Sequence, residues 1–99
     1  MSADPVIIQK QMGITHAEFM RLLPRALGSD DFRVNAKTID FTPKQGASLK
    51  IQLGTEGVRQ IALMKMPTTP VTLTLAGISD DERDAMLLRF DRAYQRGGG

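Results

Sequence analysis

The single histidine of the chain is the first candidate for chemistry. His16 is the only imidazole, and the chain contains no cysteine. Thiol nucleophiles, disulfides, thiolate zinc sites and iron–sulfur ligation are therefore excluded, and no second histidine exists to complete a metal site. His16 also falls at the first position of an expected helix, where the helix dipole disfavours an imidazolium. We expect an exposed residue with no catalytic or metal-binding role.

An acidic cluster, Asp80-Asp81-Glu82-Arg83-Asp84, is the second candidate. Its carboxylates point in different directions around a helical turn, and the central glycine of calcium-binding loops is missing. Helix capping and the attraction of carboxylates to a helix N-terminus account for the cluster. With one histidine, no cysteine and no paired acids in an evident cleft, we expect no enzyme activity, no metal site and no cofactor.

Two glycine patterns could bind or carry a ligand. Gly54 and Gly57 flank Thr55-Glu56, whose carboxylate would repel phosphate, so a turn is favoured there. The terminal residues Gly97, Gly98 and Gly99 resemble the Gly-Gly tail of ubiquitin-like proteins and sulfur carriers. The likeness covers two residues, and the tail here follows a helix rather than a strand. A helix stop with a flexible tail (97–99) is favoured, and a carrier function is an alternative.

Length and composition predict one globular domain spanning residues 1–99. The chain is 24% charged and 41% hydrophobic, with a net charge of +2. Residues 31–78 hold six basic and three acidic side chains, a mildly basic balance of +3. The N-terminus has no apolar run of the roughly 7–15 residues that a secretory signal needs, and no segment approaches the about 20 apolar residues of a membrane span. We expect a soluble, cytoplasmic protein with no membrane partner.

Two amphipathic helices are predicted near the ends of the chain. Thr15 and Glu18 form a capping box, Gly28 stops the helix in a left-handed conformation, and Pro24 predicts a kink or a restart. A second capping box, residues 79–82, begins the last helix. The stripes that would face the core are Phe19, Leu22, Leu23, Ala26 and Leu27 in the first helix, and Met86, Leu87, Phe90, Ala93 and Tyr94 in the second.

Between the helices the hydrophobic period changes to two, which is typical of strands with one buried face. Residues 47–53 and 71–76 alternate most clearly, and a strand around 60–64 follows the turn at 54–57. Proline cannot donate to a strand ladder, so we expect a connection at Pro67-Thr68-Thr69-Pro70.

Residues 32–41 change phase midway. A hairpin there would need positive φ at Ala36 and Lys37, so we expect one strand with a bulge near 36–38.

The fold class that follows is α+β with two layers. We expect a four-stranded antiparallel meander with both helices on one face, in the order α-β-β-β-β-α. Residues 1–13 form an N-terminal arm or, through Val6–Ile8, a fifth strand. The predicted core is Phe19, Leu22, Leu23, Leu27, Ile39, Phe41, Leu49, Ile51, Leu53, Ile61, Leu63, Val71, Leu73, Leu75, Met86, Leu87, Phe90 and Tyr94.

The sheet face away from the helices supplies the functional hypothesis. In a plain meander the neutral strand 71–76 is an edge without a charged residue, so it needs a cover. Either Val6–Ile8 pairs with it or another chain does, which leaves a homodimer open. The candidate interaction face is Lys50, Gln52, Gln60, Ala62, Met64, Met66, Thr72 and Thr74.

We therefore expect a small non-catalytic domain that binds another macromolecule, preferably a protein or a second copy of itself. Nucleic-acid binding through the mildly basic sheet is the alternative. It is disfavoured because the core claims most aromatic residues, which a base-stacking surface would need.

Overall fold

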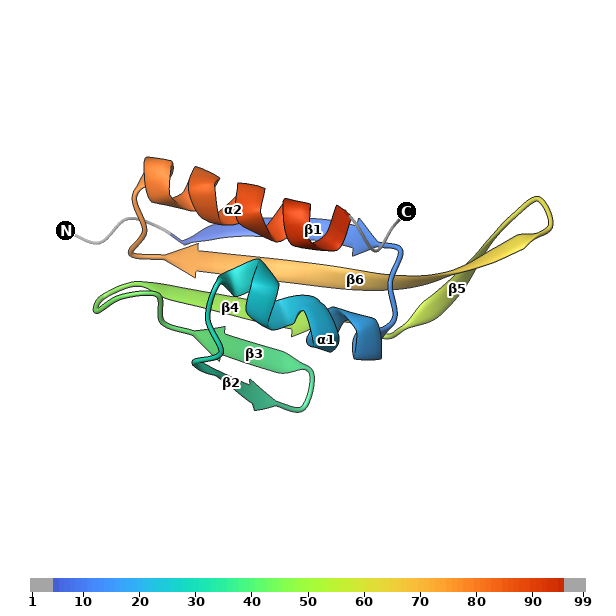
Figure 1. The fold of residues 1–99 in the computed structure, drawn as a ribbon, viewed down its shortest axis with the longest axis horizontal. Helices are drawn as coiled ribbons and strands as arrows, with labels where there is room; N and C mark the ends of the chain where they lie inside the picture. The colour runs from blue at the N-terminus through green and yellow to red at the C-terminus, as the bar shows by residue number, and fades with distance from the viewer. Residues whose placement is uncertain (1–4, 96–99) are drawn as a thin grey trace.

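The computed structural model describes residues 5–95 (Figure 1). They form an α+β fold in which six strands make one antiparallel sheet with two helices. The strand order is β1-β6-β4-β3-β2, and β5 pairs with the first part of β6. The α+β class with an antiparallel sheet is confirmed, whereas the four-stranded meander is wrong in strand number and order. The elements are β1 (Val6–Met12), α1 (His16–Leu27), β2 (Phe32–Asn35), β3 (Thr38–Phe41), β4 (Ser48–Leu53), β5 (Gly57–Ile61), β6 (Met64–Ala76) and α2 (Asp80–Gln95).

Helix α1 begins and ends where its caps predict. Thr15 has an extended backbone, and its hydroxyl accepts a hydrogen bond from the Glu18 amide at 3.1 Å. Gly28 closes the helix at φ 69°, in the left-handed region that glycine adopts without strain. The helix continues through Pro24 as one element to Leu27, so no restart occurs at the proline.

Helix α2 begins with the second capping box. The Ser79 hydroxyl accepts from the Glu82 amide at 3.2 Å, and the Glu82 carboxylate accepts from the Ser79 amide at 3.4 Å. The Lys44 ammonium lies 2.7 Å from the same carboxylate, and its hydrogen bonds, with those of Ser79, hold the pKa of Glu82 below its usual value. Glu82 is thus occupied by capping and by an ion pair.

The two helices meet through three aromatic rings. Phe19 and Tyr94 stack with centroids 4.8 Å apart and an interplanar angle of 11°, and Phe90 lies 4.8 Å from Tyr94 in a tilted arrangement. The buried Tyr94 hydroxyl donates to the Phe19 carbonyl oxygen at 2.9 Å. Burial raises the pKa of this phenol above its usual value.

The core lies between the helices and one face of the sheet. Alternate residues of β3, β4 and β6 face the helices, and cross-strand pairs such as Ile39 with Ile51 and Ile51 with Leu73 align their apolar side chains. The prediction that Ile61 and Leu63 belong to the core is wrong, because both are exposed. The buried cluster is Ile14, Phe19, Leu23, Ala26, Leu27, Ile39, Phe41, Leu49, Ile51, Leu53, Val71, Leu73, Leu75, Phe90, Ala93 and Tyr94.

The N-terminal segment is a full strand. Over residues Val6–Met12, β1 pairs with β6, from Val6 opposite Leu75 to Met12 opposite Thr69. Since β4 pairs with the other side of β6, the strand 71–76 lies inside the sheet and is not an edge. Self-association through the edge of that strand is therefore excluded.

The connection predicted at Pro67 to Pro70 is wrong, because β6 runs without a break from Met64 to Ala76. Strand β5 pairs with β6 as far as Thr68, β1 pairs from Thr69, and β4 pairs from Val71. Each proline therefore lies next to the point at which β6 exchanges one set of partners for another. An extended strand tolerates the fixed φ of proline where ladder bonds are interrupted.

The single bulged strand predicted for residues 32–41 is also wrong. Strands β2 and β3 form a hairpin across Ala36-Lys37, with Asn35 opposite Thr38. Ala36 alone takes a positive φ, 56°, so the loop does not need the same conformation at Lys37. Positive φ at the first loop position only is the pattern of a type II′ turn, which suits hairpins.

Candidate interaction site

A two-stranded arm projects from the sheet. It consists of β5 and the first five residues of β6, which pair from Gly57 opposite Thr68 to Ile61 opposite Met64. We call residues 57–68 the β5–β6 arm. Figure 1 shows it extending past the ends of both helices, with neither helix over it. The arm accounts for the elongated shape of the molecule, which measures 51 × 23 × 21 Å.

The arm exposes large apolar side chains. Leu63 at the tip is 98% exposed, and Val58, Ile61 and Met64 are 72%, 49% and 66% exposed. Ile61 and Met64 lie opposite one another and share a face at the tip, whereas Val58 lies on the other face of the arm. Single exposed apolar residues are ordinary on protein surfaces, but three at the tip of a projecting element mark a contact surface.

The turn at the tip explains why the sequence did not predict the arm. Ala62 adopts φ 56° in the two-residue loop Ala62-Leu63, which contains neither the glycine nor the asparagine that usually marks such a turn. Residues 60–64 therefore read as one strand with two core positions, while the chain in fact reverses direction there.

The arm carries a net positive charge. Residues 57–68 contain Arg59 and Lys65 and no acidic residue, a formal charge of +2. Both cations are exposed, and Arg59 lies opposite Met66 while Lys65 lies opposite Gln60. Counted from the Ile61–Met64 pair at the tip, Lys65 belongs to the next residue pair and Arg59 to the one after it. The arm thus combines an apolar tip with two cations close to it.

The start of α1 holds the β4–β5 connection in place. The Glu56 carboxylate accepts a hydrogen bond from the His16 amide at 2.8 Å, and the His16 Nε2 donates to the Gly54 carbonyl oxygen at 2.7 Å. The carboxylate at the helix N-terminus is also favoured by the helix dipole. The sequence suggested that His16 is exposed, whereas in the structure it is half-buried. Its role in the structure is to position the root of the arm.

The second strand of the arm is anchored at the same level. The buried Thr69 hydroxyl donates to the Ile14 carbonyl oxygen at 2.7 Å, and the Gln11 amide donates to the Thr68 hydroxyl. Gly54 lies so close to Pro70 that a Cβ at Gly54 would stand 2.9 Å from the proline Cγ. Both strands leave the sheet from a braced root, so the arm presents its tip in a defined direction.

The predicted interaction face divides into two places. Lys50, Gln52, Thr72 and Thr74 lie on the face of the sheet away from the helices, on adjacent positions of β4 and β6. The other members lie on the β5–β6 arm. These are Gln60, Ala62, Met64 and Met66.

Apart from the exposed Ile7 of β1, opposite Thr74, the open face of the sheet is polar and mixed in charge. Asp40 lies between Arg33 and Lys50 in the strand register, and the next open-face row contains Thr38 and Gln52. The aromatic residues of β2 and β3 belong to rows that face the helices, so this part of the described sheet offers no base-stacking platform.

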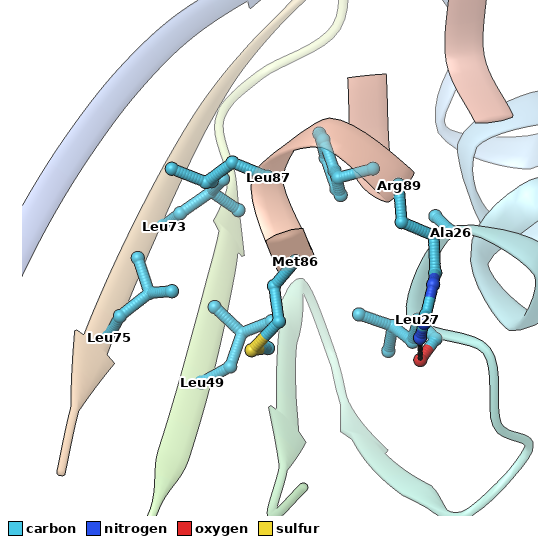
Figure 2. Close-up of a pocket in the computed structure, with 9 residues that line it drawn as sticks. Ala26, Leu27, Leu49, Leu73, Leu75, Met86, Leu87 and Arg89 are labelled. Carbon is cyan, nitrogen blue, oxygen red and sulfur yellow. Dashed lines mark hydrogen bonds between the residues drawn. The ribbon is translucent and has the colours of Figure 1, made fainter. Parts of the chain in front are cut away.

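A small apolar pocket lies where the two helices meet the sheet (Figure 2). Met86 and Leu87 point from α2 toward β4 and β6, and the Arg89 guanidinium donates to the Leu27 carbonyl oxygen at 3.4 Å. Its free volume of about 10 Å³ holds at most one water molecule. The pocket is a packing defect rather than a ligand site.

Within residues 5–95, no group of three or more His, Asp or Glu side chains is arranged to hold a metal ion. None of the helices in the same range is long and apolar enough to cross a membrane. The predicted glycine tail, Gly97, Gly98 and Gly99, lies outside the described residues.

Comparison of the chain with protein-family models, with curated proteins and with solved structures gave no match.

Proposed function

We propose that this protein is a non-catalytic binding module that contacts a partner protein through the tip of its β5–β6 arm. The near-complete exposure of Leu63 on a braced projection is the observation that supports the proposal most directly. An apolar side chain in water gains roughly 1.5–3 kcal/mol when a partner buries it fully. The exposed side chains of Ile61 and Met64 flank the turn that carries Leu63.

The chemistry of the arm favours one kind of partner. The apolar tip fits a hydrophobic pocket, and Arg59 and Lys65 behind it favour acidic side chains around the rim of that pocket. Two cations without an exposed aromatic residue are a weak basis for nucleic-acid binding, which gains its affinity from many phosphate contacts. The arm therefore favours a protein with an acid-rimmed apolar pocket.

The proposal is tested by affinity capture from extract of the source cells with three forms of the chain. The forms are the wild type, the arm variant Leu63→Asp and the control Val34→Asp, which alters an exposed apolar residue of β2 far from the arm. We expect a protein that the wild type and the control retain and that the arm variant retains at least about tenfold less. The same three forms are then measured against the purified partner.

Two outcomes would remove the proposal. One is a capture profile that Leu63→Asp and Val34→Asp change equally. The other is binding that nuclease treatment abolishes and that weakens steeply with salt, since counterion release by phosphate contacts would then make nucleic acid the partner.

A further inference from the structure

The outer edge of β1 is a second unpartnered feature, remote from the arm tip. The inner side of β1 pairs with β6 along all seven residues, Val6–Met12. No strand of the described chain pairs with its outer side. A free edge presents unpaired N–H and C=O groups, and proteins usually protect it with proline, a bulge, outward charges or short length.

Strand β1 has none of these protections. It contains no proline, and its register with β6 is continuous, so there is no bulge. Its one charged side chain, Lys10, turns onto α2 and lies 3.1 Å from Asp91. At the opposite edge of the sheet, β2 is only four residues long. The unprotected edge is therefore the longer one.

We infer that the outer edge of β1 pairs antiparallel with β1 of a second copy of this chain, about a two-fold axis at Gln9. In this register all seven residues overlap, Gln9 stands opposite its own copy, and Ile8 stands opposite Lys10. Residues opposite one another share a face of the sheet, so neither copy moves an apolar side chain to the wrong side. The register also pairs Val6 with Met12 on the helix side and sets neither Lys10 opposite the other, so no like charges meet. These pairs favour a second copy of β1 as the occupant of the edge.

Helix α2 adds an apolar contact at the same axis. The Lys10–Asp91 ion pair places α2 beside β1, and both run in the same direction (Figure 1). Leu88 is 51% exposed and precedes Asp91 by three residues, about 4.5 Å along the helix. Gln9 precedes Lys10 by about 3.3 Å along the strand. Leu88 thus stands near the level of the axis, where the second copy brings its own Leu88.

The dimer would carry its arms at opposite ends. Each β5–β6 arm leaves the sheet near Met12, at the end of β1, and the paired β1 strands run in opposite directions. The inference does not depend on the arm having a partner. A seven-residue strand pair with one helix contact is smaller than the about 800 Å² per partner of a stable interface, so we expect a micromolar equilibrium.

Charge substitution at residue 9 tests the inference. Light scattering behind size exclusion over a micromolar dilution series should show the wild type passing from dimer to monomer. Gln9→Lys and Gln9→Glu each place like charges opposite one another and should weaken the homodimer about three- to tenfold. A mixture of the two variants should associate more tightly than either alone, because opposite charges then meet.

Two further variants separate this interface from others. Leu88→Asp alters a half-exposed helix residue, should leave the circular dichroism spectrum unchanged, and should weaken the dimer. Leu63→Asp, on the arm, should leave the dimer constant unchanged. A wild type that stays monomeric at the highest concentration would overturn the inference. So would a dimer dissociation constant that is the same in the wild type, Gln9→Lys and Gln9→Glu. A dimer that Leu63→Asp dissociates would overturn it as well.

Discussion

Truncation of two leucines in the same part of the chain should change stability by very different amounts. Leu63 and Leu73 both belong to apolar segments with strand-like alternation, and sequence pattern places both in the core. The structure separates them, because Leu63 is 98% exposed at the tip of the arm and Leu73 is 1% exposed beneath the helices. Leu63→Ala and Leu73→Ala remove the same atoms from these two environments.

The expected magnitudes differ severalfold. Leu73 lies between Ile8 and Ile51 in the strand register, so truncation leaves a cavity in the centre of the sheet. Buried leucine-to-alanine changes cost about 2–5 kcal/mol, a large part of the roughly 5–15 kcal/mol that stabilises a domain. A loss of about 3 kcal/mol would lower Tm by about 12–24 °C in a chain of this size. Leu63→Ala should change the free energy of unfolding by less than about 0.5 kcal/mol.

Equilibrium unfolding in urea, followed by circular dichroism, measures both values. The slope of the transition should be the same for both variants, since neither changes the surface exposed on unfolding very much. If Leu63→Ala cost as much as Leu73→Ala, the arm would be packed against the body of the protein. The functional proposal would then lose its basis.

Three further predictions concern the framework. Gly77→Ala should destabilise the fold by at least about 3 kcal/mol, because its Cβ would overlap the backbone of Gly46. Gly46→Ala meets open space and should cost only about 1 kcal/mol, from its positive φ, and urea unfolding measures both losses. Tyr94→Phe should cost about 0.5–1.5 kcal/mol in the same assay, since it removes the hydrogen bond to α1 and keeps the stacked ring, and an unchanged stability would show that the bond contributes nothing. The pKa of Glu82 is lowered in the folded state, so its contribution to stability is present above the ordinary carboxyl pKa and is lost as pH falls through the lowered value. In Lys44→Met, an NMR titration should show a higher pKa for Glu82, and an unchanged pKa would contradict the cause assigned to Lys44.

The helices were predictable because their signals are local. A capping residue, its partner three positions later and a terminal glycine act within one or two turns, and Thr15 and Gly28 perform these roles in the structure. The alternation in β4 was equally informative, since one face of that strand is buried along its whole length.

The hairpins were not predictable from local signals. Ala36 and Ala62 occupy positions of positive φ that glycine usually fills, and their strain is accepted because strand pairing on both sides imposes it. The path of β6 through Pro67 was hidden for a related reason. Proline is excluded from a ladder only where its missing N–H is needed, and that depends on the neighbouring strands.

The amino-acid sequence by itself determined the two helices, the buried face of the central strands and the absence of thiol chemistry, because each follows from residue type and short-range spacing. Only the tertiary structure decided which strands are neighbours, that residues 57–68 leave the sheet as an arm, and that His16 and Glu56 brace its root. The braced root and the pairing of β1 with β6 arise from contacts between residues about 40 or more positions apart, which no local pattern encodes. The arm itself is local, but its turn at Ala62 lacks the glycine or asparagine that would have predicted it.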